Sequence, residues 1–213
     1  MPFTRWITPL NIARRFSTQM YVYMLPIASH DSVTGTKQNL VIPTPDGGVE
    51  HTSATFEYAG RWLARAKAAE VMLMPPQSYI LAILARFMTG LTSPGGEARN
   101  AEAQVQRERF MEYSMKLPTA ETKEGKEDPT AAIPWAQKVM SPRVLLVRGS
   151  DKRLVLGLDQ PGRELEGTAR GGDWERVVLV RITQSGPEKV EIRNREDVLA
   201  EEGRDGGTVK GLI

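Results

Sequence analysis

Alternating side chains predict the first strand of the chain over residues 16–25, after a short proline-broken stretch at residues 6–9. In the run FSTQMYVYML, successive side chains of an extended backbone point to opposite sides, and neither side is wholly polar. A strand of this kind is usually covered on both faces, so we expect it in the centre of a sheet, between helices or loops. Pro26 is expected to end it, because proline cannot donate a ladder hydrogen bond.

The following apolar segments alternate between strand and helix patterns. A strand carrying Trp62 is predicted over residues 56–63, and an alanine-rich helical turn over residues 64–70. Pro76 suits the first turn of a helix that runs from residue 77 to about residue 89. The apolar positions of this helix follow the spacing of a core-facing stripe: Ile80, Ile83, Leu84 and Phe87.

The second half of the chain changes its pattern. A highly charged surface helix is predicted over residues 97–116. Period-two segments then predict a small antiparallel meander with strands at residues 143–148, 153–158, 176–182 and 189–192. The expected fold class is therefore α/β, more strictly α+β: a mixed sheet flanked by helices, followed by the meander.

Composition suggests where this fold divides. Residues 118–134, with TKEGKEDP in the middle, have the composition of a flexible linker. We therefore expect one unit at residues 1–117, the linker at 118–134, a β extension at 135–200 and a frayed tail at 201–213.

Charge and residue usage narrow the classes of function. The chain has 213 residues, 40% of them hydrophobic, which is enough to bury a core. Its 28 basic and 26 acidic residues give a net charge of +2 and are dispersed, which argues against a nucleic-acid partner. The absence of cysteine excludes disulfides and thiolate metal sites, and fits an intracellular compartment. No apolar run of eighteen residues is present, so we expect no membrane-spanning helix.

Arginines and histidines are the candidate chemical groups. Arg14 and Arg15 precede the first strand and are candidates for binding the phosphate of a substrate, or else they are surface arginines that flank a strand. His30 and His51 lie at the two ends of a polar loop, where they either share a ligand or proton-transfer role or are solvated. The acid-poor, arginine-containing amino terminus has two interpretations, a mitochondrial transit segment or a strand with flanking arginines.

Two separated motifs resemble a known family. The motif WITP followed by ARRFSTQMYVYMLP, and AGRW (59–62) followed by PPQ (75–77), resemble the carboxy-terminal half of a Nudix hydrolase domain over residues 3–90. The similar branch is that of the peroxisomal coenzyme A and acyl-CoA diphosphatases, and LGLDQPGRELEGT and VLVRI resemble the extension of its filamentous-fungal members. The resemblance implies a partial Nudix-type mixed sheet, a Mg²⁺ or Mn²⁺ cofactor, and cleavage of the pyrophosphate bond of coenzyme A, acyl-CoA or other nucleoside diphosphate derivatives.

The catalytic signature of that family is missing from the sequence. The glutamate-rich Nudix box does not occur, and in the one similar stretch, residues 195–203, the acid pair comes two positions too late. We expect this stretch to be a solvated helix or tail. We therefore assign no catalytic and no metal-binding residue. The chain is expected to be a truncated, non-catalytic half of a hydrolase domain that is inactive alone. The alternative is a non-catalytic protein that binds a nucleotide or a partner.

If the chain is half of a hydrolase domain, this affects the partners and the cell compartment that we expect for it. Strands missing from the sheet would leave an exposed edge, which favours a homodimer. The terminal Gly211-Leu212-Ile213 is not the Ser-Lys-Leu peroxisomal address, so peroxisome and mitochondrion both stay open as compartments.

Overall fold

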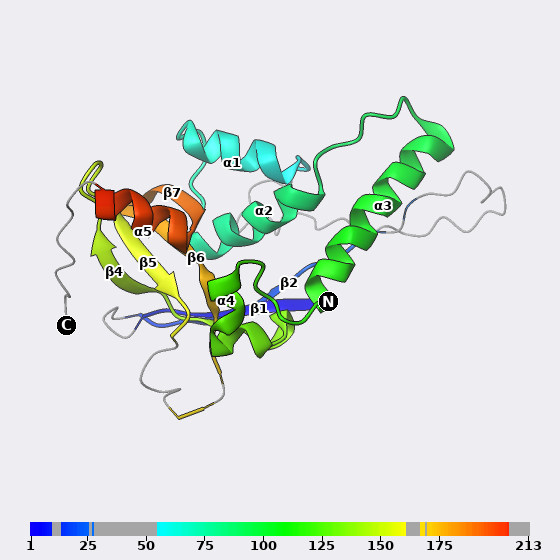
Figure 1. The fold of residues 1–213 in the computed structure, drawn as a ribbon. Coiled ribbons are helices and arrows are strands. Elements are labelled where there is room, and N and C mark those ends of the chain that lie inside the picture. The colour runs from blue at the N-terminus through cyan, green and yellow to red at the C-terminus, as the bar shows by residue number, and fades with distance from the viewer. Residues whose placement is uncertain (10–13, 26, 28–54, 161–166, 169, 205–213) are drawn as a thin grey trace.

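The computed structural model of the protein describes residues 1–9, 14–25, 27, 55–160, 167–168 and 170–204. These residues form a mixed α+β fold with one sheet of three strands and one of four, as the expected fold class requires (Figure 1). Pro26, His30 and His51 lie outside the described residues, so the predictions made for them are not addressed by the structure.

The smaller sheet has the strand order β2-β1-β3. Its middle strand, β1 (Pro2–Ile7), runs antiparallel to β2 (Ser17–Tyr21) and parallel to β3 (Val139–Met140). Phe3 and Trp6 of β1 are buried in the core. The proline-broken stretch expected at residues 6–9 therefore includes the end of a strand, which the prediction missed.

The strand predicted over residues 16–25 is shorter than expected and lies at an edge. It is β2, and the aromatic side chains in and next to it are exposed: Phe16 by 65%, Tyr21 by 67% and Tyr23 by 79%. The prediction of a central, doubly covered strand is wrong within the described part of the chain. β1 pairs with one side of β2, and no described strand pairs with the other side. Apolar side chains on both faces of a strand are thus no proof that both faces are covered.

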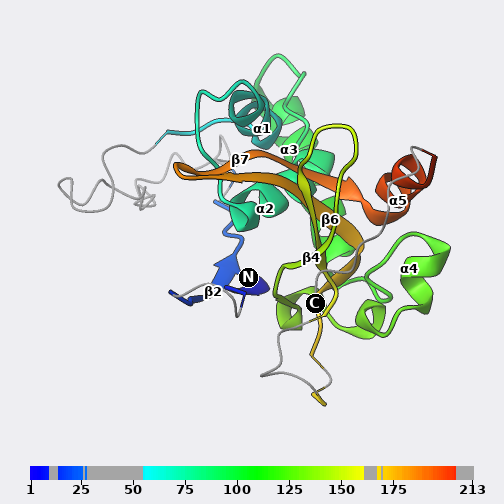
Figure 2. The same cartoon turned by 90° about the vertical axis from the view of Figure 1, so that its left-hand side faces the viewer.

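The predicted antiparallel meander is confirmed. Its strands lie in the order β4-β5-β6-β7, each antiparallel to the next. Their bounds are Arg143–Val147, Leu154–Leu158, Asp173–Thr183 and Gly186–Asn194. The middle of β6 is fully buried from Val177 to Val180, because both faces of the sheet are covered here. α2 packs on one face, and α5 packs on the other face, against β6 and β7 (Figure 2).

The helix opened by two prolines is also confirmed. α2 (Pro75–Phe87) begins with Pro75 and Pro76 in its first turn, and Gln77 Oε1 accepts the Met74 N–H at 2.9 Å. In contrast, the strand predicted over residues 56–63 is wrong. That stretch contains the start of α1 (Ala59–Lys67), because the helix-favouring, alanine-rich sequence extends back to Ala59. α1 packs on α2 and on β7 (Figure 2).

The charged helix expected over residues 97–116 is α3 (Gly96–Met115), but the linker expected after it is folded. Residues 118–134 contain α4 (Lys123–Glu127) and the 3₁₀ turn η1 (Pro129–Ala132), both of which contact β6. Small side chains let this polar segment pack closely, since Ala120 and Ala131 are both buried. A second 3₁₀ turn, η2 (Trp135–Gln137), leads into β3.

One core joins the two sides of the expected linker. Phe3 stacks on Trp135 with ring centroids 5.1 Å apart, and Tyr113 of α3 contacts the same indole. Tyr79 of α2 belongs to the same cluster as Val178 of β6. The proposed division into residues 1–117 and 135–200 therefore does not correspond to separate cores.

The last described helix extends further along the chain than predicted. α5 (Arg195–Arg204) includes residues 201–204, which were expected to belong to a frayed tail. Val198 of this helix is fully buried against the second face of the meander. Its apolar contact and its ion pairs, described below, explain why the helix continues past Ala200.

Candidate functional site

A cleft of about 310 Å³ opens between the smaller sheet and the segment that precedes β3. In the register of that sheet, Arg5 of β1 lies opposite Gln19 of β2 and beside Val139 of β3. Residues in register project from the same face of a sheet, so these three side chains form a row across it. The complete lining is Arg5, Gln19, Ile133, Ala136, Gln137, Val139 and Arg170. We call this site the Arg5–Arg170 cleft.

A loop contact brings the second arginine to the cleft. The Val139 N–H donates to the Gly171 carbonyl at 2.9 Å, which holds the segment around Arg170 beside β3. The next residue, Gly172, lies so close to β5 that glycine is required there, because a Cβ atom would lie 2.0 Å from the Leu158 carbonyl oxygen. A site is thus assembled from strands and a loop far apart in the sequence.

Both arginines of the cleft lack an acidic partner in the part of the chain that is described. Arg5 and Arg170 are exposed, and neither guanidinium forms an ion pair there. Beside Arg5, the Gln19 amide donates to the carbonyls of Thr4, at 3.1 Å, and Met20, at 3.3 Å, which fixes its position. Among the described residues, no carboxylate therefore neutralises the charge of these two arginines.

The lining of this cleft suits a phosphorylated organic ligand. Guanidinium groups present several N–H donors in a planar fork that matches phosphate oxygens, and glutamine amides add neutral hydrogen bonds. Ile133, Ala136 and Val139 supply an apolar surface beside these donors. The arrangement can bind an anion that also carries an apolar or planar group.

The two arginines singled out from the sequence lie elsewhere. Arg14 and Arg15 are exposed and precede β2, and the Arg15 Nε–H donates to the Thr8 carbonyl at 3.3 Å. Neither residue lines the Arg5–Arg170 cleft. The structure therefore does not bring Arg14 and Arg15 together with Arg5 and Arg170 in one pocket.

A second cleft, of about 390 Å³, lies over a network of buried and partly exposed charges between α2 and β6. The Tyr79 hydroxyl donates to Asp173 at 2.6 Å, and Arg176 donates to the same carboxylate at 3.0 Å. Arg176 and Arg86 both pair with Glu121, at 3.1 Å and 2.7 Å. Every arginine named here is thus neutralised by protein carboxylates, unlike those of the first cleft.

Burial and charge act against each other within this network. Burial raises the pKa of the Tyr79 hydroxyl well above its ordinary value, so the group stays protonated and donates. Burial also favours the neutral form of Asp173 and is the largest single influence on it. The positive charges of Arg176 and Lys138 and the hydrogen bonds from Tyr79 and Arg176 together outweigh burial, and they hold the pKa of Asp173 below its ordinary value. The network is therefore ionised and internally paired.

Lys138 is a buried cation held mainly by backbone carbonyls. Its Nζ donates to the Thr130 carbonyl at 2.6 Å and to the Gly172 carbonyl at 2.8 Å, and it lies 5.2 Å from the centre of the Trp135 ring. Burial lowers the pKa of Lys138 to about 8. These bonds tie η1 and the loop before β6 to β3, so Lys138 supports one wall of the Arg5–Arg170 cleft.

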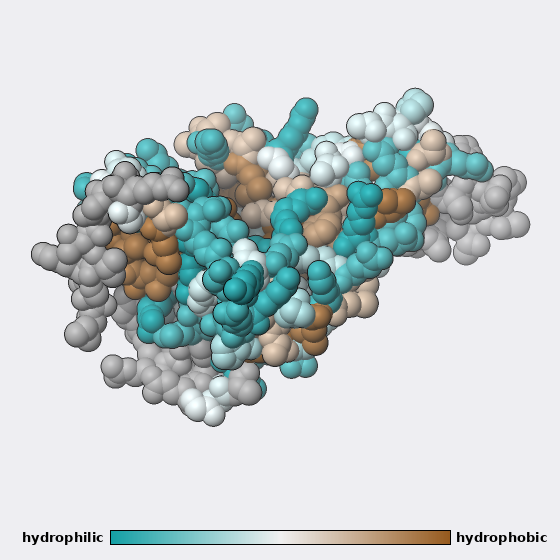
Figure 3. All heavy atoms as spheres, viewed as in Figure 1, coloured by the Kyte–Doolittle hydropathy of each residue, from teal (hydrophilic) through white to brown (hydrophobic). Residues whose placement is uncertain are grey.

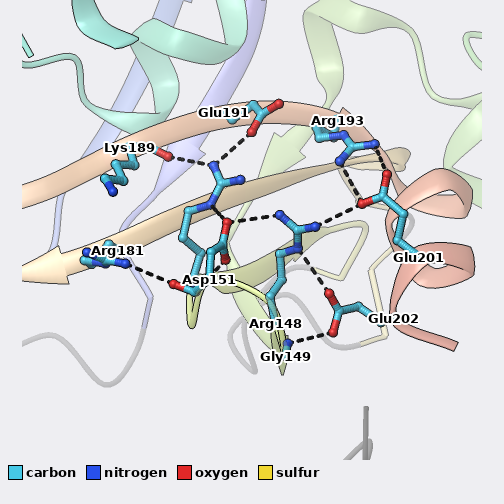
Figure 4. A network of polar contacts seen from close by, with 10 residues as sticks. Arg148, Gly149, Asp151, Arg181, Lys189, Glu191, Arg193, Glu201 and Glu202 are labelled. Carbon is cyan, nitrogen blue, oxygen red and sulfur yellow. Dashed lines mark hydrogen bonds and ion pairs between the residues drawn. The ribbon is translucent and has the colours of Figure 1, made fainter. Parts of the chain in front are cut away.

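A third group of arginines joins the β4–β5 turn to α5 (Figure 4). Arg148 pairs with Asp151 at 3.1 Å, with Glu201 at 3.0 Å and with Glu202 at 3.1 Å. Arg193 of β7 pairs with Glu201 at 2.6 Å.

The face that Figure 3 shows is mostly hydrophilic, with apolar side chains gathered near β4.

These ion pairs correct the interpretation of residues 195–203. The stretch was predicted to be a solvated helix or tail, and it is a helix, but one side of it is buried. Glu202 is only 4% exposed, and its Oε2 accepts the Gly149 N–H at 2.8 Å. The acid pair of this Nudix-like stretch is therefore held by Arg148 and Arg193.

Neither a metal cluster nor a membrane-spanning helix is found among the described residues. In that part of the chain, no group of three or more His, Asp or Glu side chains is placed to hold a metal ion, and no helix is long and apolar enough to cross a bilayer. Comparisons with protein-family models, with curated proteins and with solved structures found no match.

Proposed function

We propose that the protein is a Nudix-type relative that binds a nucleotide of the coenzyme A type in the Arg5–Arg170 cleft and does not cleave it. The observation that carries this proposal is the pair of exposed guanidinium groups, neither with an ion-pair partner among the described residues, beside the glutamines of one cleft. The lack of cleavage rests on the sequence, because the glutamate-rich Nudix box does not occur in it.

The chemistry of the ligand matches the lining of the cleft. Coenzyme A carries a pyrophosphate, a further phosphate and an adenine ring. Arg5 and Arg170 offer two positive charges to the phosphates, and hydrogen bonds to charged groups contribute about 1.5–3 kcal/mol each. The apolar side chains of Ile133, Ala136 and Val139 provide a surface for the ring or the pantetheine chain.

Calorimetric titration of the 213-residue protein with coenzyme A tests the binding. We expect a micromolar Kd for the unaltered protein. The double variant Arg5→Gln, Arg170→Gln should weaken binding at least about tenfold, because loss of one charged hydrogen bond already corresponds to that factor. No measurable binding by the unaltered protein would overturn the proposal.

The double variant Arg14→Gln, Arg15→Gln is the matched control. It removes the same charge from the exposed arginines before β2, outside the cleft, so it should change the Kd less than about twofold. If the control loses binding while the cleft variant keeps it, the phosphate site lies at Arg14 and Arg15.

A separate assay tests the absence of cleavage. Coenzyme A is incubated with the protein and Mn²⁺ or Mg²⁺, and the released nucleotide half is measured by chromatography. We expect no product above the rate without protein. Metal-dependent turnover that disappears with the cleft variant would show that this chain is itself a hydrolase.

A further inference from the structure

The free edge of the smaller sheet is formed by β2. Among the described strands, β2 pairs only with β1. The backbone of Phe16 bonds to Thr8, and that of Val22 bonds to Met1. Because N–H and C=O groups alternate in direction along an antiparallel ladder, the backbone groups of Ser17, Gln19 and Tyr21 point away from β1. They are positioned to bond to another strand.

This edge lacks two of the features that usually prevent strand pairing, charge and proline. Edge strands are commonly protected by charged side chains, proline or bulges. The five residues of β2, STQMY, include no charge and no proline. In the larger sheet, the edge strand β4 begins with Arg143, and the edge strand β7 carries several charges, among them Glu188 and Glu191. The β1–β2 and β4–β5 ladders both contain a register shift, so this feature does not distinguish the two edges.

We propose that β2 pairs antiparallel with β2 of a second copy of this chain, with Gln19 at the twofold axis. This register aligns every outward-pointing backbone group: Gln19 with its own copy, and Ser17 with Tyr21 of the second copy. It would join the two smaller sheets into one continuous sheet of six strands. The proposal does not depend on the nucleotide site.

The side chains that flank β2 favour a second copy as the occupant. With Gln19 on the axis, Arg15 comes opposite Tyr23 of the second copy, if the pairing continues two residues beyond each end. Tyr23 is 79% exposed and Arg15 is also exposed, so a guanidinium can lie over an uncovered ring on both sides of the axis. No two like charges meet in this register, because the only charged positions face tyrosine.

The dimer has a consequence for the Arg5–Arg170 cleft. Gln19 lines that cleft and also lies at the axis, so the clefts of the two copies would open next to each other. Ser17 and Tyr21 of the second copy would then neighbour the rim of each cleft.

The first test is the mass of the unaltered protein by light scattering during gel filtration. At about 100 µM we expect about twice 23.7 kDa, the mass of the single chain. The variant Gln19→Lys should be monomeric, because two lysines would lie directly opposite each other across the axis. The control Gln137→Lys adds the same charge to the same cleft outside β2 and should remain dimeric. Circular dichroism verifies that both variants are folded.

The second test is a crosslink that reports the register. The chain has no cysteine, so a single Gln19→Cys substitution gives one thiol per copy. Hydrogen-bonded antiparallel pairs have Cα atoms about 5.5 Å apart, which a disulfide can span. Mild oxidation should convert Gln19→Cys into a covalent dimer, and should leave the control Val147→Cys, on the exposed edge strand β4, mostly monomeric.

Three results would overturn the proposal. The first is a monomer at 100 µM. The second is equal crosslinking of the cysteines at positions 19 and 147. The third is a dimer that survives Gln19→Lys, because it would use another surface. A monomer whose β2 instead binds an extended peptide would assign this edge to a different polypeptide.

Discussion

Arginines occur in two contrasting settings in this protein. Around the β4–β5 turn and α5, each guanidinium that Figure 4 joins to a carboxylate is part of a structural network, and Arg176 is likewise paired in the core. At the Arg5–Arg170 cleft, neither guanidinium has an ion pair among the described residues. The same side chain is therefore neutralised by carboxylates in one region and has no ion pair among the described residues in the other, and the positions of the carboxylates make this difference.

Arg176→Met is the strongest test of this difference. The substitution leaves Asp173 buried without its charge partner, and breaking a buried pair in this way costs about 3–5 kcal/mol. Urea denaturation should show that loss, while Arg5→Met should change the free energy of unfolding by less than about 0.5 kcal/mol.

A second substitution separates charge from packing in this test. Asp173→Asn added to Arg176→Met removes one of the two buried carboxylates that lose their arginine, the other being Glu175, so the double variant should be more stable than Arg176→Met alone. If Arg176→Met costs no more than Arg5→Met, the contrast between paired and unpaired arginines has no energetic basis.

Arg148→Met should have an intermediate effect. Its guanidinium is largely buried and joins three carboxylates, of which Glu202 is itself buried, so we expect a loss of about 1–3 kcal/mol in the same denaturation experiment. Arg193→Met is the matched control, because Arg193 is more exposed and, among the described residues, forms an ion pair with Glu201 alone. It should cost about 0.2–1 kcal/mol. If the two variants lose the same free energy of unfolding, burial of the carboxylate partner does not determine how much an arginine contributes to stability.

The sequence predicted those parts of the fold that local pattern determines. The meander and α2 follow from side-chain period and from proline position, both of which act within a few residues. β1 was missed because its partners, β2 and β3, come later in the chain, one of them more than a hundred residues away. The segment at residues 118–134 appeared to be a linker because its composition is polar, yet a few alanines suffice to bury it.

The candidate site could not be predicted in the same way. Arg14 and Arg15 stand out in the sequence as a basic pair, whereas Arg5 and Arg170 are single residues 165 positions apart (170 − 5). Their meeting depends on the register of three strands and on the Val139–Gly171 hydrogen bond. No local pattern encodes such a contact.

The smallest effect is expected at Glu102. The charge of this side chain is bound by backbone N–H groups instead of by an arginine. Its carboxylate accepts hydrogen bonds from the N–H groups of Thr92 and Ser93, at 3.0 Å and 2.9 Å, which lowers its pKa from 4.5 to about 2. A carboxylate with a lowered pKa stabilises the fold above its unfolded value of 4.5, and this contribution is lost as the pH falls towards 2.

The variant Glu102→Gln shows whether backbone donors alone can hold a charge in place here. Thermal unfolding at pH 6 should give the unaltered protein a slightly higher Tm than Glu102→Gln, and the difference should shrink as the pH falls to 2, where about half of the Glu102 carboxyl groups in the folded protein are protonated. The control Glu97→Gln removes the same charge from the same helix, α3. A Tm difference that persists unchanged at pH 2 would contradict the charge as its cause, and would point to the shape of the side chain instead.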